Sequence, residues 1–280
     1  MTVDAHHHLW DLAVRDQPWL FEEDGLEPLR RTFTVEELAR AARPTGVEAT
    51  VLVQTVTEAG ETPELLALAA EHELIAGVVG WVDLEADDVA GALAALRELP
   101  GGDRLVGIRH QVQGEPDPEW LCRADVRRGL RAVADAGLAY DLLTIPVQLP
   151  AAIETARALP DLQFVVDHLS KPPIASGERE PWATQMRALA EHDNVACKLS
   201  GMVTEAHWAA WDVADLRPYA ETVLGAFGAQ RVMFGSDWPV CLVAASYAAV
   251  MGAAEELTAA LSPAERADVL AGTARRIYGL

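Results

Sequence analysis

The sequence predicts a (β/α)8 barrel, and three observations support this prediction. Short apolar segments recur along the chain, several of them without polar interruption, such as ATVLVQT, IAGVVGWV and FVVDH. Runs of this kind are typical of parallel strands that are buried on both faces. Longer segments with the periodicity of amphipathic helices lie between them, and a length of 280 residues suits eight βα units. We therefore expect residues 1–280 to form one barrel domain.

The individual elements can be placed in order along the chain. Strands are expected at residues 2–7, 48–54, 75–82, 104–111, 139–145, 163–168, 195–199 and 231–236, and the clearest helices at 61–72, 87–99, 123–137, 182–193 and 215–228. Thr34 and Glu37 form a capping-box pattern ahead of a further helix, and Gly137 and Gly228 are expected to end two helices. The segment 12–31 has no helical period, so we expect a long loop that can cover the barrel mouth.

A doubly wound open sheet is the alternative architecture, but no G-x-G-x-x-G follows the first predicted strand. The formal charge of -21 argues against nucleic-acid binding and against docking on anionic membranes, because both favour basic surfaces. The N-terminal MTVDAHHHLW lacks the features of a secretory signal. Three scattered cysteines suggest a reducing compartment, so we expect a cytoplasmic protein.

Polar side chains gather where the predicted strands end, which is where a barrel places its active site. His6 and His8 are two residues apart on the first strand, so their side chains point the same way, about 6.6 Å apart along the strand. Two imidazoles on one face can hold one cation or one substrate carbonyl. A chance pair is the alternative for this motif alone, but a histidine and an aspartate at later strand ends favour a site.

Those later residues are His168 and Asp237. Asp237 closes an apolar strand, where a carboxylate costs stability unless it is paired or solvated, so it is a site residue or a salt-bridge partner. His168 has the same parity as Val166. If it faces the barrel interior, Asp167 is expected to face the helix layer. A satisfied core histidine is the alternative for His168.

Further candidates lie at or near the strand ends. Arg109 could clamp a carboxylate or stabilise an oxyanion, or it could pair with an acidic side chain. We expect His110 and Lys198 to bind substrate, although a solvated lysine fits the pattern equally well. Trp10 and Trp81 could stack on a sugar or ring substrate, whereas core packing is the simpler interpretation for most of the eight tryptophans.

Taken together, these residues resemble the amidohydrolase superfamily, specifically the lactonase-like branch called amidohydrolase family 2. The opening DAHHHLWD…PWL is similar to the D-x-H-x-H-x-W start of L-fuconolactone and L-rhamnonolactone hydrolases. Four further segments are also similar, namely GIRHQVQGEPDPEWL, FVVDHLSKPPI, VACKLSGMVTE and RVMFGSDWPV. The resemblance extends from Asp4 to the C-terminal ARRIYGL.

The resemblance implies roles for individual residues. His6 and His8 match the metal-binding histidines of the first strand, and His168 matches the histidine after the sixth strand. Asp237 matches the aspartate that acts as general base on the attacking water. No lysine ends the fifth strand (YDLLTIP), where two-metal members carry one. The branch therefore implies one divalent ion, often zinc, or no metal.

The resemblance further implies that the protein opens a sugar lactone to a hydroxy acid. Asp237 would activate water, and a zinc ion on His6, His8 and Asp237 would assist. Without metal, His168 and Arg109 would have to stabilise the oxyanion. The alternatives are a metal-dependent, non-oxidative decarboxylase of an aromatic or unsaturated acid, and a non-catalytic barrel used for binding. The expected partner is a small lactone, while the particular sugar and the oligomeric state stay open.

Overall fold

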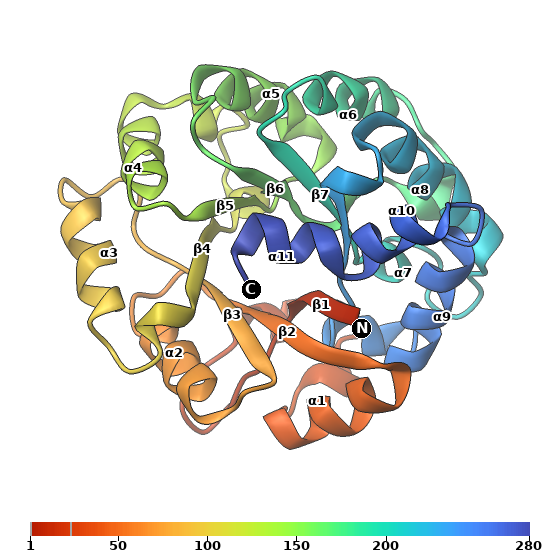
Figure 1. Ribbon diagram of the computed structural model, residues 1–280, viewed down its shortest axis with the longest axis horizontal. Helices are drawn as coiled ribbons and strands as arrows, with labels where there is room; N and C mark the ends of the chain where they lie inside the picture. Colours follow the sequence, from red (N-terminus) through yellow and green to blue (C-terminus); the bar gives the residue numbers. More distant parts are fainter. Residues whose placement is uncertain (1, 23) are drawn as a thin grey trace.

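A barrel of parallel strands forms the centre of the molecule (Figure 1). The computed structural model describes residues 2–22 and 24–280. Within them, eight strands form one sheet in which each strand pairs with the next along the chain. The strands are β1 (Thr2–His7), β2 (Val47–Val53), β3 (Ile75–Gly80), β4 (Leu105–His110), β5 (Ala139–Leu142), β6 (Phe164–Val166), β7 (Val195–Leu199) and β8 (Val232–Phe234).

Hydrogen bonds between β1 and the segment after β8 bring the two ends of the sheet together. The Asp237 N–H donates to the His6 carbonyl at 2.8 Å, and the His8 N–H donates to the Trp238 carbonyl at 2.7 Å. The predicted (β/α)8 barrel is confirmed, and the open doubly wound sheet is wrong. All eight predicted strands are present, although several end earlier than the apolar pattern suggested, because the chain turns out of the sheet before its last apolar residues.

Helices surround the barrel (Figure 1). They are α1 (Val35–Ala42), α2 (Glu61–Glu71), α3 (Val89–Arg97), α4 (Ala124–Asp135), α5 (Leu149–Ala158), α6 (Trp182–Ala190), α7 (Met202–Glu205), α8 (Val213–Phe227), α9 (Tyr247–Leu257) and α10 (Pro263–Ala267), whereas α11 (Thr273–Tyr278) lies across one end of the barrel. The Thr34–Glu37 capping box begins α1 as predicted, and Gly137 and Gly228 follow α4 and α8 with positive φ. No helix in the described ranges is both long and apolar enough to cross a membrane.

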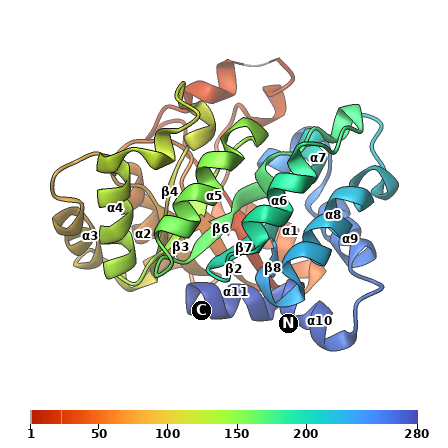
Figure 2. The ribbon, with the colours of Figure 1, turned by 90° about the horizontal axis from the view of Figure 1, so that it is seen from above.

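The two ends of the barrel differ. Helix α11 lies at the end where both termini are found (Figure 2). There Ala274 and Tyr278 pack against small inward-facing side chains such as Val3, Val51 and Ala196, which leave room for the helix to close the barrel. The strands end at the opposite side, where the polar residues predicted from the sequence gather.

The segment 12–31 lies over this opposite side (Figure 2). We expected a long loop here, and its described residues also contain two short 3-10 helices, Pro18–Phe21 and Glu27–Leu29. Proline near the start of each helix fixes the backbone in a compatible φ range, which explains these short turns without a helical period.

Candidate active site

Two histidines at the end of β1 face one another inside the barrel. His6 is fully buried and His8 nearly so, and their Nε2 atoms lie 3.1 Å apart. In a regular strand, the neighbouring side chains of Ala5 and His6 would point to opposite faces. A register shift within β1 breaks this alternation, so both side chains reach the interior of the barrel. The His8 Nδ1–H donates to the Val53 carbonyl at 2.7 Å, which leaves the Nε2 lone pair available for a ligand.

The carboxylate of Asp237 faces both of these imidazoles and a third. Its Oδ1 atom lies 3.5 Å from His8 Nε2, and 3.8 Å from both His6 Nε2 and His168 Nε2. Burial alone would raise the pKa of Asp237, but the neighbouring His168 and His8 hold it below its ordinary value. The structure therefore brings together the four residues that the sequence placed at three separate strand ends, with a carboxylate that is ionised at neutral pH.

The segment after β6 requires a correction. The expectation that Asp167 faces the helix layer is wrong, because β6 ends at Val166 and residues 168–171 have positive φ. Strand alternation therefore does not extend to His168, and both side chains turn inward. Asp167 is fully buried, and its Oδ2 accepts a hydrogen bond from Arg109 at 2.9 Å.

His168 is oriented by its contact with the end of β7. Its Nδ1 lies 2.9 Å from the Ser200 hydroxyl oxygen, so Nε2 is directed toward Asp237. Burial lowers the pKa of His168 to about 4, so the ring is neutral at neutral pH. A hydroxyl that donates to Nδ1 leaves the proton on Nε2, where it can act as a hydrogen-bond donor toward the site.

Arg109 lies beside these imidazoles with all of its nitrogen atoms engaged. Nε donates to the Gln54 side-chain oxygen at 2.9 Å, Nη1 donates to Asp167, and Nη2 donates to the Gln54 carbonyl. Nη1 also lies 3.4 Å from His6 Nε2. Gln54 was not predicted from the sequence, although a polar residue directly after the VLV run of β2 pointed to a site residue.

Lys198 is fully buried, so the alternative of a solvated lysine is wrong. Its Nζ forms ion pairs with Asp141 and, at 2.9 Å, with Asp167, and it lies 3.1 Å from His6 Nδ1. Asp141 was not among the predicted residues. An acidic side chain within the apolar strand AYDL pointed to it, because a carboxylate that is buried at such a position requires a charged or hydrogen-bonding partner.

The other predicted substrate contacts lie around the mouth of the barrel. The Trp81 indole N–H donates to His110 Nδ1 at 3.1 Å, and His110 Nε2 lies 2.7 Å from a Glu115 carboxylate oxygen. Trp10 is 5% exposed and donates its indole N–H to the Arg31 carbonyl at 2.7 Å. Substrate binding by Trp10, Trp81 and His110 stays a prediction.

The donor atoms of His6, His8 and Asp237 fit a single metal ion. Zn–N distances of about 2.0–2.1 Å in a tetrahedral site place ligand atoms roughly 3.3 Å apart, and the corresponding separations here are 3.1, 3.5 and 3.8 Å. Asp167 Oδ1 is buried, pairs with Lys198 Nζ at 2.9 Å and lies 3.3 Å from His6 Nδ1. A proton on Nδ1 directed at this oxygen would satisfy it and leave Nε2 free to bind the ion.

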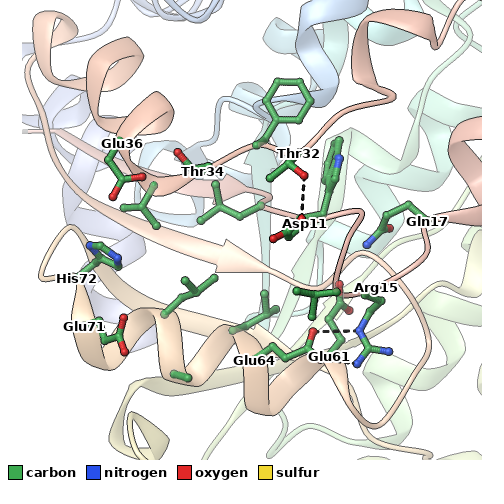
Figure 3. A pocket seen from close by; sticks show the side chains of 18 residues that line it. Asp11, Arg15, Gln17, Thr32, Thr34, Glu36, Glu61, Glu64, Glu71 and His72 are labelled. Carbon is green, nitrogen blue, oxygen red and sulfur yellow. Dashed lines mark hydrogen bonds and ion pairs between the residues drawn. The ribbon is translucent and has the colours of Figure 1, made fainter.

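A separate cavity of about 530 Å³ lies between α1 and α2 (Figure 3). Trp10 is among the residues that line it, whereas the histidines and the aspartate of the cluster are not. Its polar groups are partly engaged with one another, since Arg15 pairs with Glu64 at 2.7 Å and Thr32 donates to Asp11 at 2.9 Å. The remaining acids are spread around the space (Figure 3). We therefore assign the chemistry to the converging cluster and not to this cavity.

The fold and the site together define a class of protein. The chain belongs to the amidohydrolase family, whose sequence profile matches residues 3–280. An L-fucono-1,5-lactonase from Burkholderia ambifaria is 38% identical over 280 residues, which cover 99% of this chain and 94% of the relative.

Solved structures agree with this membership. An amidohydrolase from Burkholderia multivorans, crystallised with bound zinc, superimposes with a TM-score of 0.92 at 37% identity and covers 100% of this chain and 99% of its own. A 5-carboxyvanillate decarboxylase from Sphingomonas paucimobilis has a TM-score of 0.67 at 16% identity, covering 100% and 99% of the two chains, and this likeness supports the fold alone.

Proposed function

We propose that the protein is a lactonase that hydrolyses the 1,5-lactone of L-fuconate or of a similar deoxy-sugar acid, such as L-rhamnonate. The observation that carries the proposal is the convergence of an ionised aspartate and three imidazoles at the end of the barrel where amidohydrolases react. The 38% identity to an L-fucono-1,5-lactonase over nearly the whole chain supports the substrate class.

Asp237 supplies the general base. Because its pKa lies below the ordinary carboxyl value, Asp237 is ionised near neutral pH, and an ionised carboxylate is available to accept a proton from water. The water oxygen then forms a bond to the lactone carbonyl carbon, and the carbonyl electron pair moves to oxygen. When the intermediate collapses, the bond between the carbonyl carbon and the ring oxygen breaks, and Asp237 returns the proton to the ring oxygen. The product is a hydroxy acid.

The imidazoles stabilise the charge that develops on the carbonyl oxygen. Burial keeps the pKa of His6 well below its usual value and that of His168 at about 4, so both rings remain neutral donors or ligands. In our proposal the Nε2–H of His168 donates to the oxyanion. Zinc held by His6, His8 and Asp237 would polarise the lactone carbonyl and lower the pKa of water. Arg109 Nη1, next to His6, adds positive charge at the same place.

The three cysteines are unpaired, which is consistent with our further proposal that the enzyme works in the reducing cytoplasm on a carbohydrate-derived substrate.

The test is hydrolysis of a panel of sugar lactones, measured as acid release with a pH indicator. We expect L-fucono-1,5-lactone to be opened faster than the D-sugar lactones that serve as controls. Folded protein that releases no acid from any lactone would overturn the proposal. The same assay on chelator-treated protein of measured metal content tests the metal site. Activity that falls and returns with zinc supports it, whereas full activity without metal leaves His168 and Arg109 to stabilise the oxyanion.

A further inference from the structure

Tyr278 is the third residue from the end of the sequence but reaches into the interior of the barrel. It belongs to α11, at the end opposite the candidate active site (Figure 2). The residue is 4% exposed, and its hydroxyl lies 2.8 and 2.9 Å from the two carboxylate oxygens of Asp141 on β5. A phenol can donate one hydrogen bond, so this hydroxyl is committed to Asp141.

Asp141 in turn forms an ion pair with Lys198, and the Lys198 ammonium contacts the His6 ring. The ammonium of Lys198 contacts Asp141, Asp167 Oδ1 at 2.9 Å and His6 Nδ1 at 3.1 Å. Two of its three N–H donors serve the carboxylates of Asp141 and Asp167, and Asp167 Oδ1 also lies 3.3 Å from His6 Nδ1, whose proton it can accept. Lys198 and both carboxylates are fully buried, so bulk solvent does not reach these groups. The position of the ammonium is therefore set by its two carboxylate partners.

The His6 ring is located between this ammonium and the reacting site. Its Nδ1 faces Lys198, while its Nε2 faces His8 Nε2 at 3.1 Å and Asp237 Oδ1 at 3.8 Å. A displacement of the ammonium changes the rotation of the ring and therefore the direction of the Nε2 lone pair. A continuous line of contacts thus connects the closing helix of the barrel to the candidate metal ligand.

We propose that Tyr278 is a positioning residue for His6, acting through Asp141 and Lys198. The closing helix α11 therefore contributes to turnover as well as to stability. The effect on turnover rests on the proposed lactonase function, whereas the effect on the His6 ring does not.

The experiment compares Tyr278→Phe with Tyr219→Phe. Both substitutions remove one tyrosine hydroxyl from a buried residue, but Tyr219 on α8 donates to the Glu178 carbonyl at 2.9 Å and has no contact with Asp141. The ring nitrogens are observed by NMR of protein labelled with 15N-histidine, with the His6 signals assigned from His6→Asn. The values of kcat and KM for L-fucono-1,5-lactone and the thermal unfolding midpoint are measured in parallel.

We expect Tyr278→Phe to shift the His6 ring signals and to lower kcat by about tenfold, a typical effect of losing a partner behind a metal ligand, with KM within about twofold of wild type. Tyr219→Phe is expected to change only the unfolding midpoint. Unchanged His6 signals in Tyr278→Phe would overturn the proposal. The NMR measurement needs no substrate. If the wild type does not hydrolyse the lactone, the proposed function is wrong, and the spectra still test the positioning role of Tyr278.

Asp141→Asn provides a second test that holds even if Tyr278→Phe does not fold. We expect it to move the same His6 signals, because it weakens the same link to Lys198. Where both single variants fold, their effects on kcat should be less than additive in the double variant, since both substitutions act along one line of contacts. Unmoved His6 signals in Asp141→Asn, or fully additive losses of kcat, would contradict the proposal.

Discussion

Single residues in this site depend on backbone conformations that regular strands do not provide. His168 and Asp237 both have positive φ, at 51° and 56°. Such values are uncommon for residues other than glycine and persist only where the surroundings enforce them. Around His168 the enforcing contact is with the end of β7, where Ser200 bonds to the ring and Gly201 leaves space for it.

Gly201→Ala should therefore damage catalysis. A Cβ atom at Gly201 would lie 2.5 Å from His168 Nδ1, so the ring would have to move. Gly177→Ala is the matched control, because Gly177 also has positive φ but a Cβ atom there would have no neighbour within 4 Å. Both variants should lose roughly 1–2 kcal/mol of stability from the left-handed backbone, but only Gly201→Ala should lose turnover. Urea unfolding and the lactone assay measure the two effects. Equal turnover in the two variants would refute the role assigned to His168.

Asp141 should give the protein a distinctive pH dependence. Burial raises its pKa from 3.8 to about 6, against the opposing effect of Lys198. Asp167 and Tyr278 are its other polar neighbours. A carboxyl with a raised pKa binds its proton more tightly in the folded state, so its stabilising contribution is present at low pH and is lost as pH rises through about 6.

Asp141→Asn removes this titration. The free energy of unfolding of the wild type minus that of Asp141→Asn should fall between about pH 4 and pH 7, by on the order of 3 kcal/mol. Urea unfolding of both proteins across this pH range provides the measurement. A difference that stays constant or rises with pH would show that the ionised form of Asp141 is not disfavoured by folding.

Among the elements, β1 and β8 are joined by one buried carboxylate. Asp4 accepts hydrogen bonds from the Ser236 N–H at 2.8 Å and hydroxyl at 2.6 Å, from the Tyr247 hydroxyl at 2.8 Å and from the His6 N–H at 3.1 Å. Ser236 directly precedes Asp237, so this cluster of bonds sets the position of the base relative to the histidines.

Two substitutions test how much this cluster of hydrogen bonds contributes to the stability of the protein. Tyr247→Phe removes one donor and should cost about 1–2 kcal/mol of stability, whereas Asp4→Asn places an amide N–H against existing donors and should cost roughly 2–3 kcal/mol or more. Denaturant unfolding measures both costs. If Asp4→Asn is no more destabilising than Tyr247→Phe, the carboxylate does not hold the two strands together.

The strands β1 and β6 show where prediction from the sequence succeeded and where it failed. Strand alternation correctly placed His6 and His8 on one side, although β1 ends at His7 and contains a register shift. It failed for Asp167, because the chain leaves β6 one residue earlier and changes conformation. Alternation applies only within a strand, and the residues that carry chemistry lie where strands end.

For the whole molecule, the barrel was predictable because each apolar run is buried in a parallel sheet and each helix has one apolar side. The sequence also indicated which strand ends carry chemistry. It did not indicate that Lys198, Arg109 and Asp141 form a buried charge network, because that depends on three-dimensional neighbours of β4, β5 and β7. The cavity between α1 and α2 likewise has no signature in the sequence pattern (Figure 3).

The decisive measurement is the turnover of L-fucono-1,5-lactone by Asp237→Asn and by Asp11→Asn, each compared with wild type. Asp237 lies in the histidine cluster, and Asp11 lines the cavity between α1 and α2. We predict that Asp237→Asn lowers kcat by about 10²-fold or more, the usual range for loss of a general base, and that Asp11→Asn keeps the wild-type rate. Near-native turnover by a folded Asp237→Asn variant would contradict the assignment of this cluster as the active site of a lactonase.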